Sequence, residues 1–344
     1  MDSEKAKTLL VVGAGGFIGG FICAEGIRRG YDTYAGVRES TSRRYLADIS
    51  ADRQVNFDYA DPDTLQKQLT AAAPDGGWDT IIYNLGATKC LNFADFNKIN
   101  YVYLRNFVEA LRATGLIPRR FLYMSSLSAL GNADDKNYTP IDTRTIPNPN
   151  TRYGLSKIKA ETLLEMQTDL PWTIFRPTGV YGPHEQDYLM MVKCIDSHFD
   201  FGVGYKTQML TFIYVDDLVG AMFDALATDR TVRRKYIISE PRAYTQKEFR
   251  SIVAKALGKK AVIPIRLPLW IAYVASVVAE KWSLISLKPS TLNRDKYKIM
   301  RQRNWRCSVE DAQRDFGFKS NFPLERGIAE TVKAYLAEKN ENKK

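Results

Sequence analysis

The stretch "TLLVVGAGGFIGG", residues 8–20, decides the fold. A run of Leu and Val leads into a cluster of glycines, and a helical stretch follows from about Phe17 to Arg29. The spacing is GxxGxxG at Gly13, Gly16 and Gly19, whereas GxGxxG from Gly13 fails because residue 18 is isoleucine. Such a turn between a first strand and a first helix lets backbone N–H groups approach a pyrophosphate at the helix N-terminus. The turn therefore predicts dinucleotide binding, with a tight turn that holds no ligand as the alternative.

Apolar runs that resemble strands alternate with helical stretches along the first half of the chain. The predicted strands are residues 8–14, 31–38, 55–60, 78–86, 119–126 and 172–180. This alternation predicts an α/β fold with a doubly wound parallel Rossmann sheet. After Pro177 the pieces become shorter, which predicts a smaller, mostly helical C-terminal substrate domain.

Two later segments, 209–217 and 234–240, have the pattern of strands that return to the first domain. We therefore expect residues 1–180, with 209–240 returning to them, to form the nucleotide-binding domain. Residues 181–208 and 241–340 are expected to form the substrate-binding domain.

Composition excludes several classes of protein. The 344 residues are 45% hydrophobic and 26% charged, which is ordinary for a globular chain. The four cysteines are far apart without a CxxC pair, so we predict no metal site or disulfide framework and expect a cytoplasmic setting. The net charge of +10 favours anionic partners, but the basic residues are scattered and no nucleic-acid-binding motif accompanies them. We therefore expect no nucleic-acid partner.

The end of the second predicted strand indicates which dinucleotide binds. NAD-binding proteins usually place an acid there, on the ribose 2′-hydroxyl. Here the strand ends in Gly36 and Val37, and Arg38 follows. A guanidinium can bind a 2′-phosphate through paired hydrogen bonds, and Arg43 and Arg44 are close in sequence. We therefore predict NADP (NADPH) as the cofactor and NAD as the less favoured one, with a solvated surface charge as the alternative for Arg38.

The stretch "TRYGLSK", residues 151–157, places Tyr153 and Lys157 four positions apart in a predicted helix. Residues at this spacing share one face of a helix. The charge of Lys157 is expected to favour the tyrosinate and to lower the pKa of Tyr153, which would make the tyrosine an acid–base group. Many helices carry such a pair on a solvated face. The other motifs in the chain must therefore decide whether Tyr153 and Lys157 are catalytic.

Those motifs occur in an order that resembles the short-chain dehydrogenase/reductase superfamily, and more closely its extended, epimerase-like branch. The resemblance runs from about residue 8 to residue 336. The ordered motifs are GxxGxxG, "FDYAD" (57–61), "NLGA" (84–87), "SSLSALG" (125–131), the Tyr153–Lys157 pair, "RPTGVYGP" (176–183) and "FIYVDDLVGA" (212–221).

The resemblance implies a catalytic set of Ser126, Tyr153 and Lys157, in which Tyr153 exchanges a proton with the substrate oxygen as hydride moves to or from the nicotinamide. Ser126 is chosen because it lies five residues before Gly131, as in relatives, and Ser125 and Ser128 remain alternatives. The predicted cofactor-binding residues are Gly13, Gly15, Gly16, Phe17, Ile18 and Gly19 in the glycine loop, Arg38 at the 2′-phosphate, Asp58 and Tyr59 at adenine, Leu85 and Ala87 at the cofactor ribose, Tyr153 and Lys157, and Pro177, Thr178 and Val180 at the nicotinamide.

Asn100 matches a helix asparagine that relatives often carry. The alternative for this residue is a structural polar side chain that bends the helix.

Two features bear on the substrate. Nucleotide-sugar relatives usually carry an Arg just before the segment equivalent to "FIYVDD", where this chain has Met209, Leu210 and Thr211. Residues 267–298, which are apolar and then basic, resemble those of 3β-hydroxysteroid dehydrogenase-like and dihydroflavonol reductase-like relatives.

We therefore predict an NADPH-dependent reductase or dehydrogenase. Its substrate would be a ketone or secondary alcohol of a hydrophobic molecule, lipid-like or polycyclic, such as a 3-keto-sphingolipid or a steroid-like ketone. The alternatives are a nucleotide-sugar epimerase/dehydratase and a non-catalytic dinucleotide-binding regulator.

The same segment, 267–298, has three readings: the core of the small domain, an apolar substrate pocket, or a membrane-surface patch flanked by Lys281, Lys288 and Lys296. Its longest apolar stretch, 269–279, is shorter than the roughly 20 residues that a membrane-spanning helix requires. The third reading predicts peripheral membrane contact, at the inner membrane surface. Apolar residues in 103–111 and 155–166 predict a homodimer, as in relatives.

Overall fold

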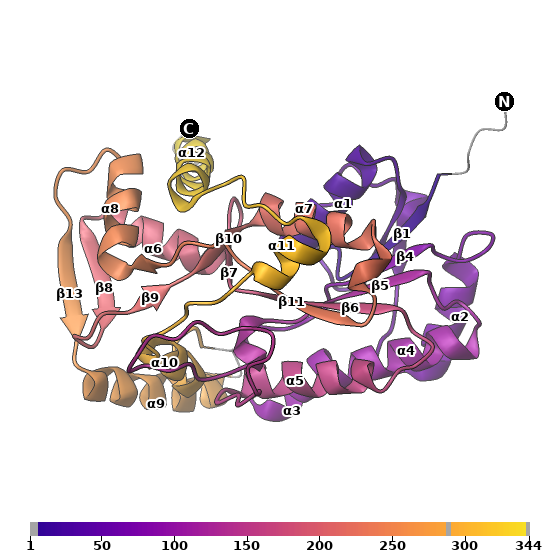
Figure 1. The fold of residues 1–344 in the computed structure, drawn as a ribbon, viewed down its shortest axis with the longest axis horizontal. Coiled ribbons are helices and arrows are strands. Elements are labelled where there is room, and N and C mark those ends of the chain that lie inside the picture. The colour runs from indigo at the N-terminus through magenta and orange to yellow at the C-terminus, as the bar shows by residue number, and fades with distance from the viewer. Residues whose placement is uncertain (1–5, 287–289, 342–344) are drawn as a thin grey trace. The chain divides into compact units, whose positions relative to one another are not determined.

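The computed structural model describes residues 6–286 and 290–341, and its central feature is a seven-stranded sheet (Figure 1). The strands are β1 (Thr8–Val12), β2 (Asp32–Val37), β3 (Gln54–Asn56), β4 (Thr80–Tyr83), β5 (Arg120–Met124), β6 (Trp172–Pro177) and β11 (Arg234–Ile238). Their order is β11-β6-β5-β4-β1-β2-β3, and the pairs from β6 to β3 are parallel. This is the doubly wound order, so the predicted fold class is confirmed.

Helices cover both faces of this sheet (Figure 1). Its helices are α1 (Phe17–Arg28), α2 (Pro62–Ala72), α3 (Phe93–Asn97), α4 (Tyr103–Ala113), α5 (Arg152–Glu165) and α7 (Val215–Leu226). Side chains of α2, α4 and α5 share one buried cluster with β1, β4 and β5. Strands buried on both faces are expected in a parallel sheet of this kind, and β1, β4 and β5 are buried throughout.

The homodimer through α4 and α5 stays a prediction.

The helical segment between β4 and β5 is interrupted. A π-helical turn, Lys98–Val102, separates α3 from α4. Such turns are rare and occur often at functional sites. This one contains Asn100, whose side chain is completely buried.

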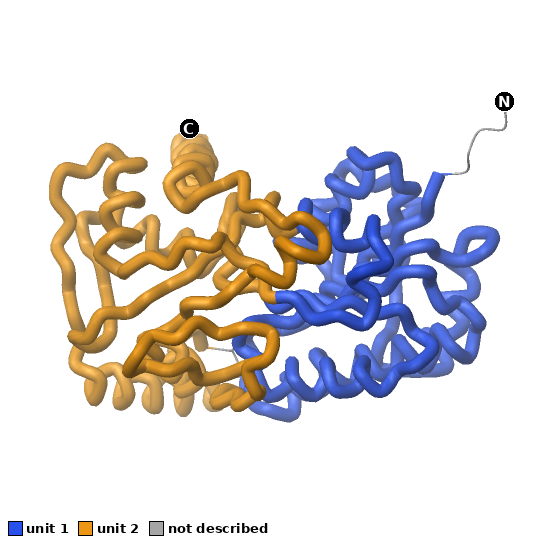
Figure 2. Tube along the Cα trace, in the orientation of Figure 1, with its two compact units in different colours: residues 1–129, 152–176, 219–236 blue, residues 130–151, 177–218, 237–344 orange. Residues whose placement is uncertain are grey.

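The chain forms two compact units, each built from three separate segments (Figure 2). Unit 1 comprises residues 1–129, 152–176 and 219–236, and unit 2 comprises 130–151, 177–218 and 237–344. Besides the first part of α7, unit 2 contains β7 (Gly179–Tyr181), α6 (Gln186–Asp196), β8 (Phe199–Val203), β9 (Met209–Leu210), β10 (Phe212–Tyr214), β12 (Tyr244–Thr245), α8 (Gln246–Ala256), β13 (Ile263–Leu267), α9 (Leu269–Ser286), α10 (Arg294–Arg301), α11 (Glu310–Phe316) and α12 (Leu324–Glu341).

The two segments expected to return to the sheet behave differently. Residues 234–238 join it as β11, beside β6. Residues 209–217 instead form β9, β10 and the start of α7, and β10 pairs with β7 in a separate two-stranded sheet. The core of unit 2 explains this, because β10 contributes Phe212 and Tyr214 to an aromatic cluster that also contains Tyr181 of β7.

A buried ion pair joins α5 to the sheet. The guanidinium of Arg176 in β6 donates to the carboxylate of Glu161 in α5, with Nε 3.1 Å from Oε1, and the two side chains are 1% and 0% exposed. The hydroxyl of Ser125, which follows β5, donates to the same carboxylate. Because a buried carboxylate is stable only when it is paired and hydrogen-bonded, this cluster fixes the position of α5 on β5 and β6.

We predict that Arg176→Met lowers the free energy of unfolding by about 3–5 kcal/mol, because it leaves the carboxylate of Glu161 buried without its counter-charge. Urea denaturation followed by circular dichroism measures the loss. Arg112→Met is the matched control, since the ion pair between Arg112 and Asp169 is 36% and 49% exposed on its two sides. That control should lose less than about 1 kcal/mol. Equal losses in the two variants would contradict this account of the cluster.

Candidate active site

The glycine loop between β1 and α1 is closely packed. Gly13 has a φ of +84°, in the left-handed region, and a Cβ there would lie 2.7 Å from the backbone nitrogen of Leu85. A Cβ on Gly19 would lie 2.3 Å from the carbonyl oxygen of Gly13. Only glycine fits these two positions, because real Cβ atoms do not approach backbone so closely.

The N-terminus of α1 is open to a ligand. Gly16 is its N-cap, is exposed, and supplies no side chain to cap the helix, and the first turn contains no acidic residue. The first N–H groups of a helix have no partner within the helix and favour an anion. The loop and the first turn, which includes Phe17 and Ile18, therefore fit the pyrophosphate of a dinucleotide.

The chain after β2 passes over this loop. A Cβ on Gly15 would lie 2.2 Å from Cγ2 of Thr41. Arg38, the first residue after β2, is exposed. Arg43 is engaged elsewhere, since its NH2 donates to Oδ1 of Asn56 at 2.8 Å. Arg38 is therefore the better placed of the two for a 2′-phosphate, and the residues that end β2 offer no acid for a 2′-hydroxyl.

Two predicted adenine contacts differ in accessibility. Asp58 is exposed, and its Oδ1 accepts a hydrogen bond from the Ala60 nitrogen at 2.9 Å. The ring of Tyr59 is 1% exposed and packs in the core against Phe57 and Phe107. The Tyr59 ring therefore lies in the core, because alternate residues of this extended segment point inward, and the role of Asp58 and Tyr59 at adenine stays a prediction.

The predicted catalytic side chains come together in unit 1. Tyr153, near the start of α5, is half-buried and hydrogen-bonds with the side chain of Ser126, which follows β5. Nζ of Lys157 lies 6.0 Å from the centre of the Tyr153 ring and donates to the carbonyl oxygen of Met124 at 2.7 Å. A Cβ on Gly86 would lie 3.1 Å from the same Nζ, so Lys157 also faces the loop after β4.

Burial has the largest effect on the pKa values of Tyr153 and Lys157. It raises the pKa of Tyr153 to about 12, and the hydrogen bond with Ser126 opposes that rise. It lowers the pKa of Lys157 to about 7, while the nearby carboxylate of Glu161 acts in the other direction. In this structure burial therefore raises the pKa of Tyr153 where a lowering was expected, because the loss of solvent disfavours the phenolate.

Asn100 connects the loop after β4 to α5. Its Oδ1 accepts from the Ala87 nitrogen at 2.7 Å, and its Nδ2 donates to the Ala87 carbonyl at 3.0 Å and to Oγ of Ser156 at 2.9 Å. Ser156 in turn donates to the carbonyl oxygen of Tyr153 at 2.7 Å. Asn100 therefore positions both the predicted ribose contact at Ala87 and the start of the catalytic helix. Leu85, the other predicted ribose contact, is buried, with its backbone beside Gly13.

Sequence reasoning missed the residues that support this site: Ser125 as a support, Ser156, Glu161 and Arg176. One signal was available, since Arg176 is a charged residue inside the apolar strand "TIFRPT" and so requires a buried partner. Glu161 follows Lys157 by four residues and therefore shares its helix face.

Pro177, Thr178 and Val180 belong to unit 2. The Thr178 nitrogen donates to the carbonyl oxygen of Ile238 at 3.2 Å, and Val180 pairs with Ile213 between β7 and β10. Their place beside a nicotinamide stays a prediction.

Relatives and solved structures resemble this chain over most of its length. The 2-alkyl-3-oxoalkanoate reductase of Stenotrophomonas maltophilia (strain K279a) is 25% identical over 336 residues, which cover 93% of this chain and 97% of the reductase. Short-chain dehydrogenase/reductase family 42E member 1 of Bos taurus is 27% identical over 276 residues, with coverage of 72% and 68%. The structure of RMD from Pseudomonas aeruginosa complexed with NADPH has a TM-score of 0.73 at 17% identity, covering 97% of this chain and all of that one, which shows a shared fold.

The family model described as "NAD dependent epimerase/dehydratase family" matches residues 9–239, which is more than half of the chain. The match contains the glycine loop and the Tyr153–Lys157 pair. The family and the names of the relatives agree on dinucleotide-dependent oxidation and reduction. The chain belongs to the NAD dependent epimerase/dehydratase family, and it is an NAD(P)-dependent oxidoreductase of the extended short-chain dehydrogenase/reductase type.

Proposed function

We propose that the protein is an NADPH-dependent reductase that acts on a ketone of a hydrophobic substrate. The observation that carries this proposal is the meeting of Ser126, Tyr153 and Lys157 at the carboxyl end of β5, with Lys157 also facing the loop after β4. Ligands of doubly wound sheets bind at the carboxyl ends of the strands. The arrangement supports a proton donor next to a bound cofactor.

Each side chain has a distinct task in this mechanism. The Ser126 hydroxyl donates a hydrogen bond to the substrate carbonyl oxygen, and the phenol of Tyr153 transfers its proton to that oxygen. A tyrosine with a pKa of about 12 stays protonated at neutral pH, as a proton donor requires. Lys157, whose pKa burial lowers to about 7, stabilises the remaining phenolate when it is in its ammonium form, and Asn100 positions the start of α5. Bound NADPH supplies the hydride.

The preference for NADPH over NADH is supported by Arg38. It lies exposed directly after β2, whose last residues are Gly36 and Val37, while Thr41 and Ser42 hold the following chain against the glycine loop. A guanidinium at this place suits a 2′-phosphate and gives no acceptor to a 2′-hydroxyl.

The hydrophobic substrate is supported by two observations. Residues 209–211 carry no Arg for the phosphates of a nucleotide sugar, and they are tied to residues 303–305, with Oγ1 of Thr211 donating to the Trp305 carbonyl at 2.6 Å. The name of the Stenotrophomonas relative describes a 3-oxo group on an alkyl-substituted alkanoate, which is a ketone on an aliphatic molecule. Both favour a lipid-like ketone over a sugar nucleotide.

We predict that Tyr153→Phe binds NADPH normally and lowers kcat by about 10²–10⁴, because only the proton donor is lost. Lys157→Met should lower both kcat and affinity for NADPH. Fluorescence titration and steady-state kinetics on a substrate found by screening measure these effects. Tyr101→Phe and Lys159→Met are matched controls and should change neither quantity. Near-normal turnover by Tyr153→Phe would place the acid elsewhere.

We predict that Arg38→Ala weakens NADPH binding by about 10–100-fold, which is the loss of a charge-assisted contact, and leaves NADH binding almost unchanged. Isothermal titration with both cofactors measures the change. Arg43→Ala is the comparison, because its guanidinium is already engaged with Gln54 and Asn56, and it should have a smaller effect. Equal affinity of the unaltered protein for the two cofactors would contradict the preference.

We predict that long-chain or polycyclic ketones, including 3-keto-sphingolipids and steroid-like ketones, are reduced with oxidation of NADPH. UDP- and dTDP-sugars should not bind. A spectrophotometric screen at 340 nm, the absorbance of reduced nicotinamide, together with thermal-shift measurements on the sugar nucleotides, separates the two classes. Turnover of a UDP- or dTDP-sugar would replace this proposal with the epimerase/dehydratase alternative.

A further inference from the structure

Helix α9 carries its apolar residues on the side that faces solvent. Trp270, Val278 and Trp282 are 69%, 62% and 69% exposed. The buried residues of the helix are Ala272, Ser276, Glu280 and Ser283. A surface helix of a globular protein normally buries its apolar stripe and exposes its polar one, so α9 has the reverse orientation. Of the three readings of residues 267–298, the one that places these aromatic residues in the core of the small domain does not fit this orientation.

The inner face of α9 is held by polar and aromatic contacts. The Glu280 carboxylate accepts hydrogen bonds from the backbone nitrogen and Nε of Arg294, both at 3.0 Å. The ring of Tyr273 packs edge-on against Tyr297, with centroids 5.3 Å apart. Because Arg294 and Tyr297 belong to α10, these contacts fix which side of α9 faces outward.

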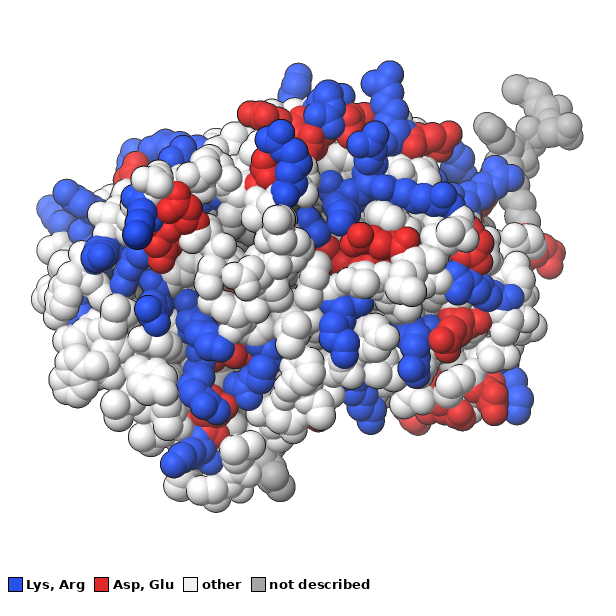
Figure 3. Space-filling view, turned by 60° about the horizontal axis from the view of Figure 1, so that its bottom comes forward, with Lys and Arg blue, Asp and Glu red and all other residues white. Residues whose placement is uncertain are grey.

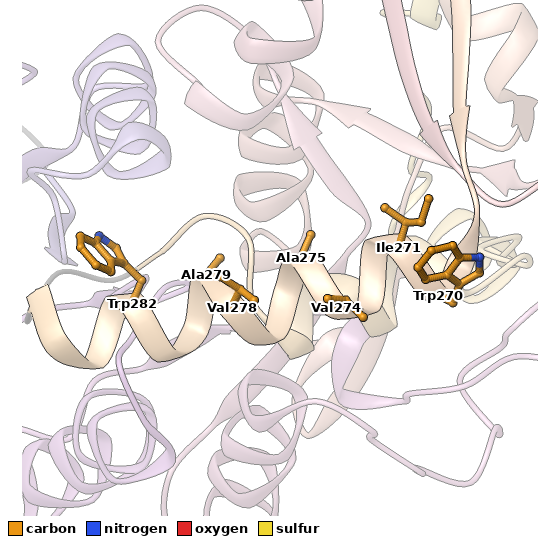
Figure 4. A pocket seen from close by; sticks show the side chains of 7 residues that line it. All are labelled: Trp270, Ile271, Val274, Ala275, Val278, Ala279 and Trp282. Atoms are coloured by element: carbon orange, nitrogen blue, oxygen red, sulfur yellow. The ribbon is translucent and has the colours of Figure 1, made fainter.

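The outer face of α9 is an open apolar surface. It is lined by aliphatic side chains between Trp270 and Trp282, whose indoles project at opposite ends of the helix (Figure 4). β13 leads directly into α9 through Pro268.

Basic residues accompany this apolar face in the sequence, and two of them are ion-paired, Arg294 with Glu280 and Lys296 with Asp187. Residues 269–301 contain six Lys and Arg side chains, one of which, Lys288, lies outside the described residues. The two acids in this range, Glu280 and Asp295, are buried at 6% and 8% exposure. Figure 3, in which the side that carries α9 is turned forward, shows a wide uncharged area at the lower left with Lys and Arg beside it.

We infer that α9 docks unit 2 on an anionic lipid surface, with the helix axis in the plane of the membrane. A helix with an apolar face and flanking cations binds at the boundary between headgroups and acyl chains. Indoles favour that boundary, and each cation near an anionic surface adds to the affinity. This inference depends on neither the cofactor nor the substrate proposed above.

Two other arrangements of α9, a contact between two copies and a membrane-spanning helix, fit these contacts and charges less well. A contact between two copies would bring the net positive charge of this part of both chains to one interface, whereas an anionic lipid surface supplies the opposite charge. Within residues 6–286 and 290–341, α9 is also the one helix long and apolar enough to cross a membrane. Crossing would strip Glu280 from Arg294 and carry a carboxylate into hydrocarbon, at a large energetic cost.

Vesicle flotation with the full chain tests this inference. We expect flotation with vesicles that contain phosphatidylglycerol and weak flotation with phosphatidylcholine alone. Val274→Asn with Val278→Asn should lower the partition coefficient at least about tenfold, because it removes apolar contact area. Lys281→Gln with Arg301→Gln should lower it about tenfold or more on anionic vesicles only. Circular dichroism checks that each variant is folded.

Matched controls remove similar groups elsewhere. Ile27→Asn with Ile146→Asn changes two other exposed aliphatic residues, and Lys67→Gln with Lys319→Gln removes the same charge. Neither control should change flotation. Equal binding by the α9 variants and their controls, or no binding to anionic vesicles, overturns the inference. So does a shift from dimer to monomer in the Val274/Val278 variant without any vesicle binding, because the face would then join two copies.

Depth-dependent quenching of tryptophan fluorescence distinguishes a helix α9 that lies on the membrane from one that crosses it. Trp270 and Trp282 are twelve residues apart, or about 18 Å along a helix. In an in-plane helix both indoles are quenched by lipids brominated near the headgroup, and Trp270→Phe and Trp282→Phe each remove part of that quenching. If one indole is quenched from the opposite leaflet, α9 crosses the bilayer and the inference is wrong.

Discussion

A carboxylate that water cannot reach determines how α5 lies on the sheet. Glu161 is completely buried, and a buried charge persists only with a counter-charge and hydrogen bonds. Arg176 and Ser125 supply them from β6 and from the end of β5. Because Lys157 precedes Glu161 by one helical turn, the pairing of Glu161 also fixes the height of Lys157 above Met124. The candidate active site thus depends on an ion pair that has no contact with the reacting atoms.

A second set of hydrogen bonds holds the other end of α5, where the helix begins. Asn100 lies in a π-helical turn and binds both Ala87 and Ser156. The loop after β4 and the start of α5 are therefore held by one side chain. An ordinary α-helical turn would rotate the following residues by a different angle, so the irregular turn accounts for the reach of Asn100. Positioning of the cofactor contacts and of Tyr153 is consequently coupled.

Much of unit 1 could be predicted from local patterns. The glycine loop and the order of strands and helices follow from spacing and periodicity, and these specify the sheet. The buried ring of Tyr59 and the raised pKa of Tyr153 could not be predicted, because both depend on how many atoms surround a side chain. The pairing of 209–217 outside the main sheet was also missed, since a short apolar run does not specify its partner strand.

The orientation of α9 illustrates the same limit. Composition gives the amount of apolar surface on a helix, and the partners of Glu280 decide which face is turned inward. The hydrogen bonds of the Glu280 carboxylate therefore had more influence on the orientation of α9 than its aromatic residues had. The core reading of residues 267–298 could only be set aside once α10 was placed beside α9.

The two units are interleaved along the chain, and this affects how the protein folds during its synthesis. The strand next to β6 is β11, which ends at Ile238, so most of the polypeptide leaves the ribosome before the sheet is complete. Until then β6 presents free backbone groups at an unprotected edge, the kind of surface that promotes aggregation. Residues 130–151 and 177–218 must also wait for partners near the C-terminus. The nascent chain is thus expected to depend on chaperones until its later segments have been made.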